Sequence, residues 1–196
     1  GVSPTITTGG ADLSFSTGNL VLSSAGTTTF TTGSGSAGGI TVAGTIDGTN
    51  GQDEALALES GSGAIQLQGT IGGTNPVTTL AINSTNGSAG TIEIVGIGDS
   101  DTTGASSTAT IGNTSTGTLT LDGTIYKTGG NQTYVASAGN NINITNTSNA
   151  AFTTTNADIT FGTANIELAN DVDLTLDSGG GGGCLLYTSD AADESD

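Results

Sequence analysis

The chain has 196 residues, of which 34 are glycine and only one, Lys127, is basic, and its net charge at pH 7 is −17. This balance excludes nucleic-acid binding, because Lys and Arg side chains are needed to neutralise phosphates. Histidine is absent, which excludes a nucleophile activated by a histidine base. No apolar stretch approaches the roughly 18 residues of a membrane-spanning helix, so we expect no membrane insertion.

Short apolar-x-apolar pairs recur along the chain at intervals of 20 to 27 residues. Such brief alternation is typical of β-strands with one buried side, and no window favours a long helix. We expect the apolar members to point inward and the residue between them, Val21 in the first pair and mostly polar in the others, to point outward. The pairs are Leu20 and Leu22, Ile40 and Val42, Ile65 and Leu67, Ile92 and Ile94, Leu119 and Leu121, Ile142 and Ile144, and Ile166 and Leu168.

A second regularity follows six of these pairs, four positions after each begins. Glycine or asparagine stands there each time, and both residues enter left-handed backbone conformations readily. We therefore expect corresponding corners, mostly with positive φ, at Gly44, Gly69, Gly96, Gly123, Asn146 and Asn170. Apolar alternation resumes two residues later, at Ile46, Ile71, Ile125 and Val172, and precedes some pairs, as at Leu56 and Leu58.

Strand, corner and strand every ~25 residues predict an all-β chain that coils as a parallel β-solenoid of about seven turns. One repeat cannot bury its apolar side alone, but stacked repeats can. We expect residues 1–178 to be a solenoid segment of a longer repeat protein, and residues 179–196 to be a glycine-rich linker and a disordered tail. The alternative is a low-complexity chain with coincidental periodicity, against which the glycine and asparagine positions weigh.

Three strings carry a resemblance to a known class of protein: "GADLSFSTGNLVLSS", "GSAGGITVAGTIDG" and "ANIELANDVDLTLDSG". They resemble the β-strand repeats of filamentous-haemagglutinin-like adhesins and autotransporter passenger domains, over about residues 11–178. The resemblance implies a right-handed parallel β-helix, secreted by a bacterium or displayed on its surface as a stalk. It further implies host or environmental surfaces, or polysaccharide, as partners, together with neighbouring repeats of the same chain.

The C-terminal residues have a sequence unlike that of the repeats. Residues 184–194, "CLLYTSDAADE", resemble codon by codon the translated transposon adapter of sequencing libraries. This resemblance implies that the tail is not native and that the native repeat continues differently. Cys184, the only cysteine, therefore carries no redox or metal argument.

Candidate chemistry is confined to acidic loops. Asp99 and Asp101 in "GDSDTTG" are weak calcium candidates, because Ca²⁺ prefers carboxylate oxygens, and Asp53 and Glu54 form a second pair on a loop. The simpler interpretation is that all four are solvated acids, and no cofactor is expected. The alternative function is a polysaccharide-active β-helix enzyme, in which two carboxylates would have to face one cleft. We expect a non-enzymatic chain.

Threonine is abundant and suits a pleated strand surface. A flat threonine array that binds ice or an extended polysaccharide would need one column of outward threonines over many turns. The expected outward column between the apolar pairs mixes Val, Thr, Gln, Glu and Asn, which disfavours such an array there. Tyr126 and Lys127 interrupt the repeat pattern, and we expect them on an exposed turn.

Overall fold

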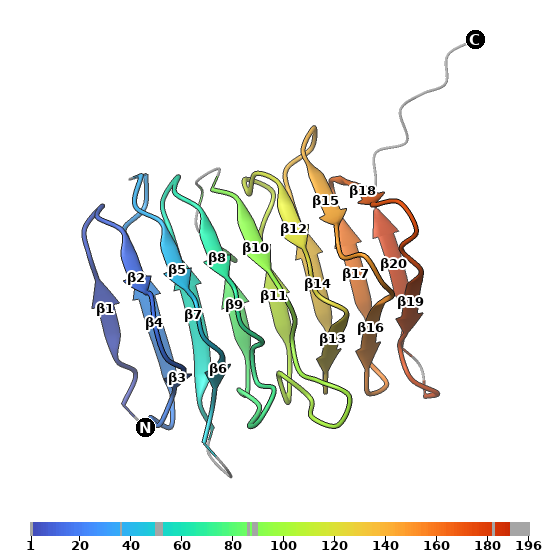
Figure 1. Ribbon diagram of the computed structural model, residues 1–196, viewed down its shortest axis with the longest axis horizontal. Helices are drawn as coiled ribbons and strands as arrows, with labels where there is room; N and C mark the ends of the chain where they lie inside the picture. Colours follow the sequence, from blue (N-terminus) through green and yellow to red (C-terminus); the bar gives the residue numbers. More distant parts are fainter. Residues whose placement is uncertain are drawn as a thin grey trace.

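The computed structural model describes residues 2–35, 37–49, 53–85, 87, 90–181 and 183–188. Of residues 186–188 it describes the backbone alone. These residues contain strands and no helix, and hence no helix that could cross a membrane. Figure 1 shows the strands side by side along the long axis, in chain order from one end to the other.

Three rows of parallel strands make up the molecule. Sheet A contains β1 (Thr5–Thr7), β4 (Thr27–Thr31), β7 (Ala55–Glu59), β9 (Leu80–Ile82), β11 (Ala109–Ile111), β14 (Gln132–Val135), β17 (Ile159–Gly162) and β20 (Leu185–Thr188). Sheet B contains β2 (Leu13–Phe15), β5 (Ile40–Val42), β8 (Ile65–Leu67), β10 (Ile92–Ile94), β12 (Leu119–Leu121), β15 (Asn141–Ile144) and β18 (Asn165–Leu168). Sheet C, as we name the third row, contains β3 (Leu20–Val21) with β6 (Ile46–Asp47), and β13 (Ile125–Thr128) with β16 (Ala150–Thr154) and β19 (Leu174–Asp177).

The chain visits the three rows in turn and then returns to the first, which is the path of a β-solenoid. Each strand pairs in parallel with the strand one turn later, as Ile65 does with Ile92 and Ile92 with Leu119. Sheet B has seven strands one turn apart, so six turns separate its first strand from its last. The predicted parallel β-solenoid is confirmed.

Its interior consists of the predicted apolar pairs in the middle of the rod. From Ile40 to Ile144 every predicted inward residue of sheet B is at most 1 % exposed. In the last strand the prediction is wrong for Leu168, which is 47 % exposed, and Ile166 is only partly buried. Beyond β18 no described strand covers this side of the stack, so its apolar side chains lack a neighbouring layer.

The first turn of sheet B differs from the predicted pair. Leu13 and Phe15, rather than Leu20 and Leu22, are the partners of Ile40 and Val42 in sheet B. Leu20 instead pairs with Ile46 in sheet C. Two alternating apolar pairs follow each other here, and the first of them lies 27 residues before Ile40, in step with the later turns.

Sheet C continues through single bridges where no regular strand forms. Ile46, Ile71, Ile97 and Tyr126 pair in succession, and Tyr126 then pairs with Phe152. Tyr126 is therefore fully buried, and its expected place on an exposed turn is wrong. The inward positions of this strand are shifted by one residue from those expected. Tyr126 therefore points inward, whereas Ile125 is only partly buried.

The glycine positions of the repeat serve close approach of the backbone. Only Gly96 among the six proposed corner residues has positive φ, so the expected conformation is wrong for Gly44, Gly69, Gly123, Asn146 and Asn170. A Cβ at Gly69 would stand 2.3 Å from the Gly44 carbonyl oxygen, and one at Gly123 would stand 1.8 Å from the Val95 oxygen. A side chain is excluded because consecutive turns touch through their backbones.

Left-handed residues instead follow strands of sheet A. Asn83 after β9, Gly112 after β11 and Thr163 after β17 have φ of 46°, 77° and 64°. Asn83 is buried there, and its side-chain oxygen accepts a hydrogen bond from the backbone N–H of Ser60 one turn earlier, at 2.9 Å. A polar side chain thus replaces a strand hydrogen bond at this corner.

The tail contains a four-residue strand where disorder was expected. Leu185–Thr188 form β20, which pairs with β17, so the expected disorder is wrong for this segment. A terminal strand presents unpaired backbone groups, to which any extended segment within reach can pair. The pairing leaves the non-native origin of the tail a prediction, and residues 189–196 lie outside the described part.

Candidate functional site

The outer surface of sheet B carries one side chain from each turn in a straight row. The register aligns seven outward residues, which we call the mixed column: Ser14, Thr41, Gln66, Glu93, Thr120, Asn143 and Glu167. Because Ser14 rather than Val21 belongs to the first turn, the whole column is polar. Gln66 Nε2 donates a hydrogen bond to Glu93 Oε2 at 3.3 Å, which links two consecutive turns.

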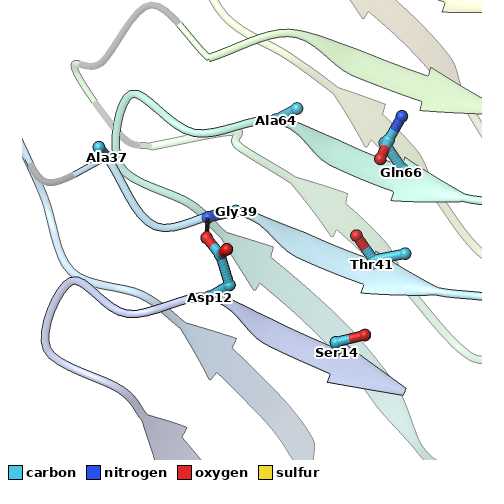
Figure 2. A pocket seen from close by; sticks show the side chains of 7 residues that line it. All are labelled: Asp12, Ser14, Ala37, Gly39, Thr41, Ala64 and Gln66. Carbon is cyan, nitrogen blue, oxygen red and sulfur yellow. Dashed lines mark hydrogen bonds between the residues drawn. The ribbon is translucent and has the colours of Figure 1, made fainter. Parts of the chain in front are cut away.

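A shallow hollow of about 330 Å³ lies at the first three turns of this column. Figure 2 shows Ser14, Thr41 and Gln66 projecting from neighbouring strands, with Asp12 at the loop that precedes β2. The Asp12 carboxylate accepts a hydrogen bond from the Gly39 N–H at 2.8 Å, which joins the loops of two turns. Hydroxyl, amide and carboxylate groups converge here, so the surface can exchange hydrogen bonds with a polar ligand.

Sheet A carries a more uniform row. Its register aligns what we call the threonine column: Thr5, Thr29, Ala57, Ala81, Thr110, Thr133 and Thr160. Neighbouring members are one strand spacing apart, about 4.8 Å. The column contains no charged residue although the chain carries 18 acidic residues. Five of the seven members are threonine, and Ala57 and Ala81 separate the first two from the last three, so the threonine array considered from the sequence is present only in part, on sheet A.

The two calcium candidates lie in a loop that is held by its own backbone. Asp99 Oδ1 accepts hydrogen bonds from the N–H groups of Asp101 and Thr102, at 2.8 and 2.5 Å. These bonds favour the ionised form and hold the pKa of Asp99 below its ordinary value. Lys127 Nζ donates to the Ser100 carbonyl at 3.0 Å and fastens the loop to the next turn.

The loop has no further acidic side chain grouped with these two. Among the described residues, no group of three or more His, Cys, Asp or Glu side chains could hold a metal ion. Asp99 Oδ1 is engaged in shaping the turn, and Asp101 is exposed. Calcium binding by Asp99 and Asp101 stays a prediction.

Two features of the structure do not follow from the repeat pattern. The sequence does not reveal the threonine column, because its members are separated by 23 to 29 residues and lie on the strands that precede the apolar pairs. The expectation that Glu54 is a solvated loop acid is wrong, because its side chain is fully buried. The parity with Leu56 and Leu58 could have found it, because residues two apart on a strand share one side.

Comparisons with protein families, with curated proteins and with solved structures found no match.

Proposed function

We propose that the chain is a stalk segment of a large secreted or cell-surface bacterial adhesin, with a weak, distributed binding surface for neutral polysaccharide. The observation that carries the proposal is the threonine column, which lies in register along seven neighbouring strands and has threonine on five of them. A solenoid adds length by adding turns, each about 4.8 Å. A stalk needs this property more than it needs a single pocket.

The threonine column suits a neutral, extended ligand for two reasons. Each hydroxyl can donate one hydrogen bond and accept two, and the β-branched side chains have few rotamers to lose on binding. The surrounding negative charge repels acidic glycans, whereas a neutral chain meets no such barrier. Individual contacts are weak, so affinity depends on many turns acting together.

Deleting one turn tests the stalk proposal. Residues 92–118 span one repeat, because Ile92 and Leu119 are register partners. We expect the shortened chain to fold, to unfold cooperatively and to retain polysaccharide binding in near proportion to its remaining turns. Asp99 and Asp101 are removed with this turn. Turnover of any polysaccharide by the intact chain, abolished by Asp99→Asn, would instead establish an enzyme.

Binding is tested by removing hydroxyl groups while keeping shape. Thr110→Val combined with Thr133→Val removes two neighbouring hydroxyls of the threonine column, and Thr120→Val, which lies on sheet B outside the hollow, is the control. We expect several-fold weaker retention on insoluble cellulose or chitin for the pair and little change for Thr120→Val. Equal retention by the pair, by Thr120→Val and by the parent chain would refute a role for sheet A.

A further inference from the structure

The hollow over the first turns of sheet B is bordered by small residues. The outward positions directly before β5 and β8 hold Gly39 and Ala64, in line with Asp12 before β2. The corresponding positions before β10 and β12 hold Thr91 and Thr118. The early turns therefore leave about 330 Å³ of space where the later turns carry β-branched side chains.

The polar groups around the hollow are open to a ligand. Asp12 and Ser14 are exposed, and Thr41 and Gln66 are only partly buried. One carboxylate oxygen of Asp12 accepts the hydrogen bond from the Gly39 N–H. Figure 2 shows the other oxygen turned away from Gly39. This second oxygen is therefore available to a molecule that enters the hollow.

These groups are mostly hydrogen-bond acceptors. The Asp12 carboxylate can only accept, and the hydroxyls of Ser14 and Thr41 can accept or donate. Gln66 Nε2 donates to Glu93 Oε2 on the next strand at 3.3 Å. The Gln66 Oε1 acceptor lies on the side of Thr41 (Figure 2). A ligand that satisfies this lining must therefore bring several donors.

The lining also carries a negative charge that no positive side chain balances. Lys127 is the only basic residue of the chain, and it lies in β13 of sheet C and donates to the Ser100 carbonyl. The net charge of −17 further attracts cations to the surface of the protein. A cationic donor therefore fits the hollow better than a neutral or an acidic group.

We propose that the hollow binds a protonated amino sugar, as a unit of a deacetylated polysaccharide. The ammonium group, which has three N–H donors, bonds Asp12 and Gln66 Oε1, and the sugar hydroxyls bond Ser14 and Thr41. A lysine side chain offers the same ammonium group but no hydroxyls for Ser14 and Thr41, which favours the sugar. The site is on sheet B and does not rest on the function proposed for the threonine column.

The test follows the backbone amide signals of the isotope-labelled chain by nuclear magnetic resonance. A short glucosamine oligomer is added at mildly acidic pH, where its amines are protonated. We expect saturable shifts at Gly39, Ala64 and Gln66. The N-acetylated oligomer of the same length should bind several-fold more weakly, because acetylation removes the charge.

Three variants place the ligand in the hollow. Asp12→Asn keeps an acceptor for the Gly39 N–H but removes the charge, and should weaken glucosamine binding about fivefold, the upper end for an exposed ion pair. Asp122→Asn is the matched control, because it removes another exposed charge, next to β12 of the same sheet. It should bind like the parent chain. Ala64→Thr introduces the side chain of the later turns and should weaken binding by narrowing the hollow.

Circular dichroism and thermal unfolding check the fold of each variant. The proposal is overturned by the absence of saturable shifts at the hollow, or by equal binding in folded Asp12→Asn or Ala64→Thr. Tighter binding of an oligolysine of the same charge would also overturn it, and would make a cationic peptide the ligand. Thr110→Val combined with Thr133→Val should bind glucosamine like the parent, so that failure of the threonine column and failure of this site are distinguishable.

Discussion

The same solenoid cross-section is filled in two different ways along the rod. In the aliphatic turns, residues 40–111, sheet C contributes Ile46, Ile71 and Ile97 to the interior. In the aromatic turns, residues 125–162, the same column continues with Tyr126 and Phe152. Sheet A changes in parallel, because Ile111 pairs with Tyr134 and Tyr134 with Phe161.

In the aromatic turns the rings form two stacked pairs that contact each other edge to face. Tyr126 stacks on Phe152 with centroids 4.6 Å apart, and Tyr134 stacks on Phe161 at 5.2 Å. The two stacks meet edge to face, as Phe152 and Phe161 do at 5.3 Å and 75°. Stacked and edge-to-face pairs both contribute beyond their buried area.

Polar groups enter the interior with the tyrosines. The Tyr126 hydroxyl accepts a hydrogen bond from the Gly123 N–H and donates to the Ile94 carbonyl, at 2.8 and 3.2 Å. The Tyr134 hydroxyl donates to the buried Gln132 Oε1 at 2.9 Å. The aliphatic column of sheet C needs no such partners. The repeat therefore sets the position and direction of each inward side chain, whereas the chemical type of that side chain differs from turn to turn.

Truncating the aromatic stack should have the largest effect. Phe152→Ala removes a ring that contacts Tyr126, Tyr134 and Phe161. We expect a loss of about 3–5 kcal/mol in the free energy of unfolding, because the cavity cannot close between rigid neighbouring turns. Ile71→Val, in the same column of the aliphatic turns, should cost about 0.5–1.5 kcal/mol. Urea unfolding measures both, and a Phe152→Ala cost no larger than that of Ile71→Val would contradict the comparison.

The second largest loss of stability is expected where the backbones of consecutive turns are in contact. Gly123→Ala places a Cβ against the Val95 carbonyl and should destabilise by about 1–3 kcal/mol, the usual range for overpacking. Gly69→Ala, in the aliphatic turns, should fall in the same range, because its neighbours are also backbone atoms. Gly87→Ala is the matched control, since a Cβ there meets no atom within 4 Å. Thermal unfolding that ranks Gly87→Ala with the other two would refute the close approach.

Much of this architecture could be predicted from the sequence. The intervals from Ile40 to Ile142 locate sheet B because each inward residue is large and apolar and each outward one is polar. Sheet A was found where Leu56 and Leu58 show the same alternation. The first repeat failed because two apolar pairs, beginning at Leu13 and Leu20, satisfy the pattern equally well, and only pairing between turns distinguishes them.

The remaining features depend on contacts that one repeat does not reveal. Glycine is needed at Gly69 for proximity to another turn, whereas the sequence suggested a left-handed corner; both requirements select the same residue. Tyr126 looked like an interruption because the offset of β13 moves the inward position by one. Burial of Glu54 follows from the parity of its strand, but its cost depends on partners that only the packed turns define.

Gln132 is the buried polar anchor of the aromatic turns. Its replacement should lower the free energy of unfolding by about as much as the alanine substitutions at Gly69 and Gly123, or slightly less. Gln132→Leu keeps most of the volume but removes the acceptor of the Tyr134 hydroxyl and the donor to the Tyr126 and Thr153 carbonyls. Unsatisfied buried groups of this kind cost about 1–3 kcal/mol. The control is Gln66→Leu on the outer surface of sheet B, which should change stability by less than about 0.5 kcal/mol. If Gln132→Leu left the free energy of unfolding unchanged, the aromatic turns would not require the hydrogen bonds of Gln132.

Alkaline pH should distinguish the two kinds of turn with the smallest effect per residue. Burial raises the pKa of Tyr126 and of Tyr134 well above the ordinary value. Above pH 10 the unfolded chain therefore releases these protons while the folded chain retains them, so stability falls as pH rises. At pH 11 the expected loss is about 1.4 kcal/mol per tyrosine, one pH unit beyond the unfolded pKa.

The measurement is the slope of the unfolding free energy between pH 9 and pH 11. Tyr126→Phe combined with Tyr134→Phe should flatten this slope, although removal of the hydroxyl groups lowers stability at every pH. A variant with the slope of the parent would show that both hydroxyls ionise in the folded chain. The aromatic turns would then be open to solvent, and their contrast with the sealed aliphatic turns would be lost.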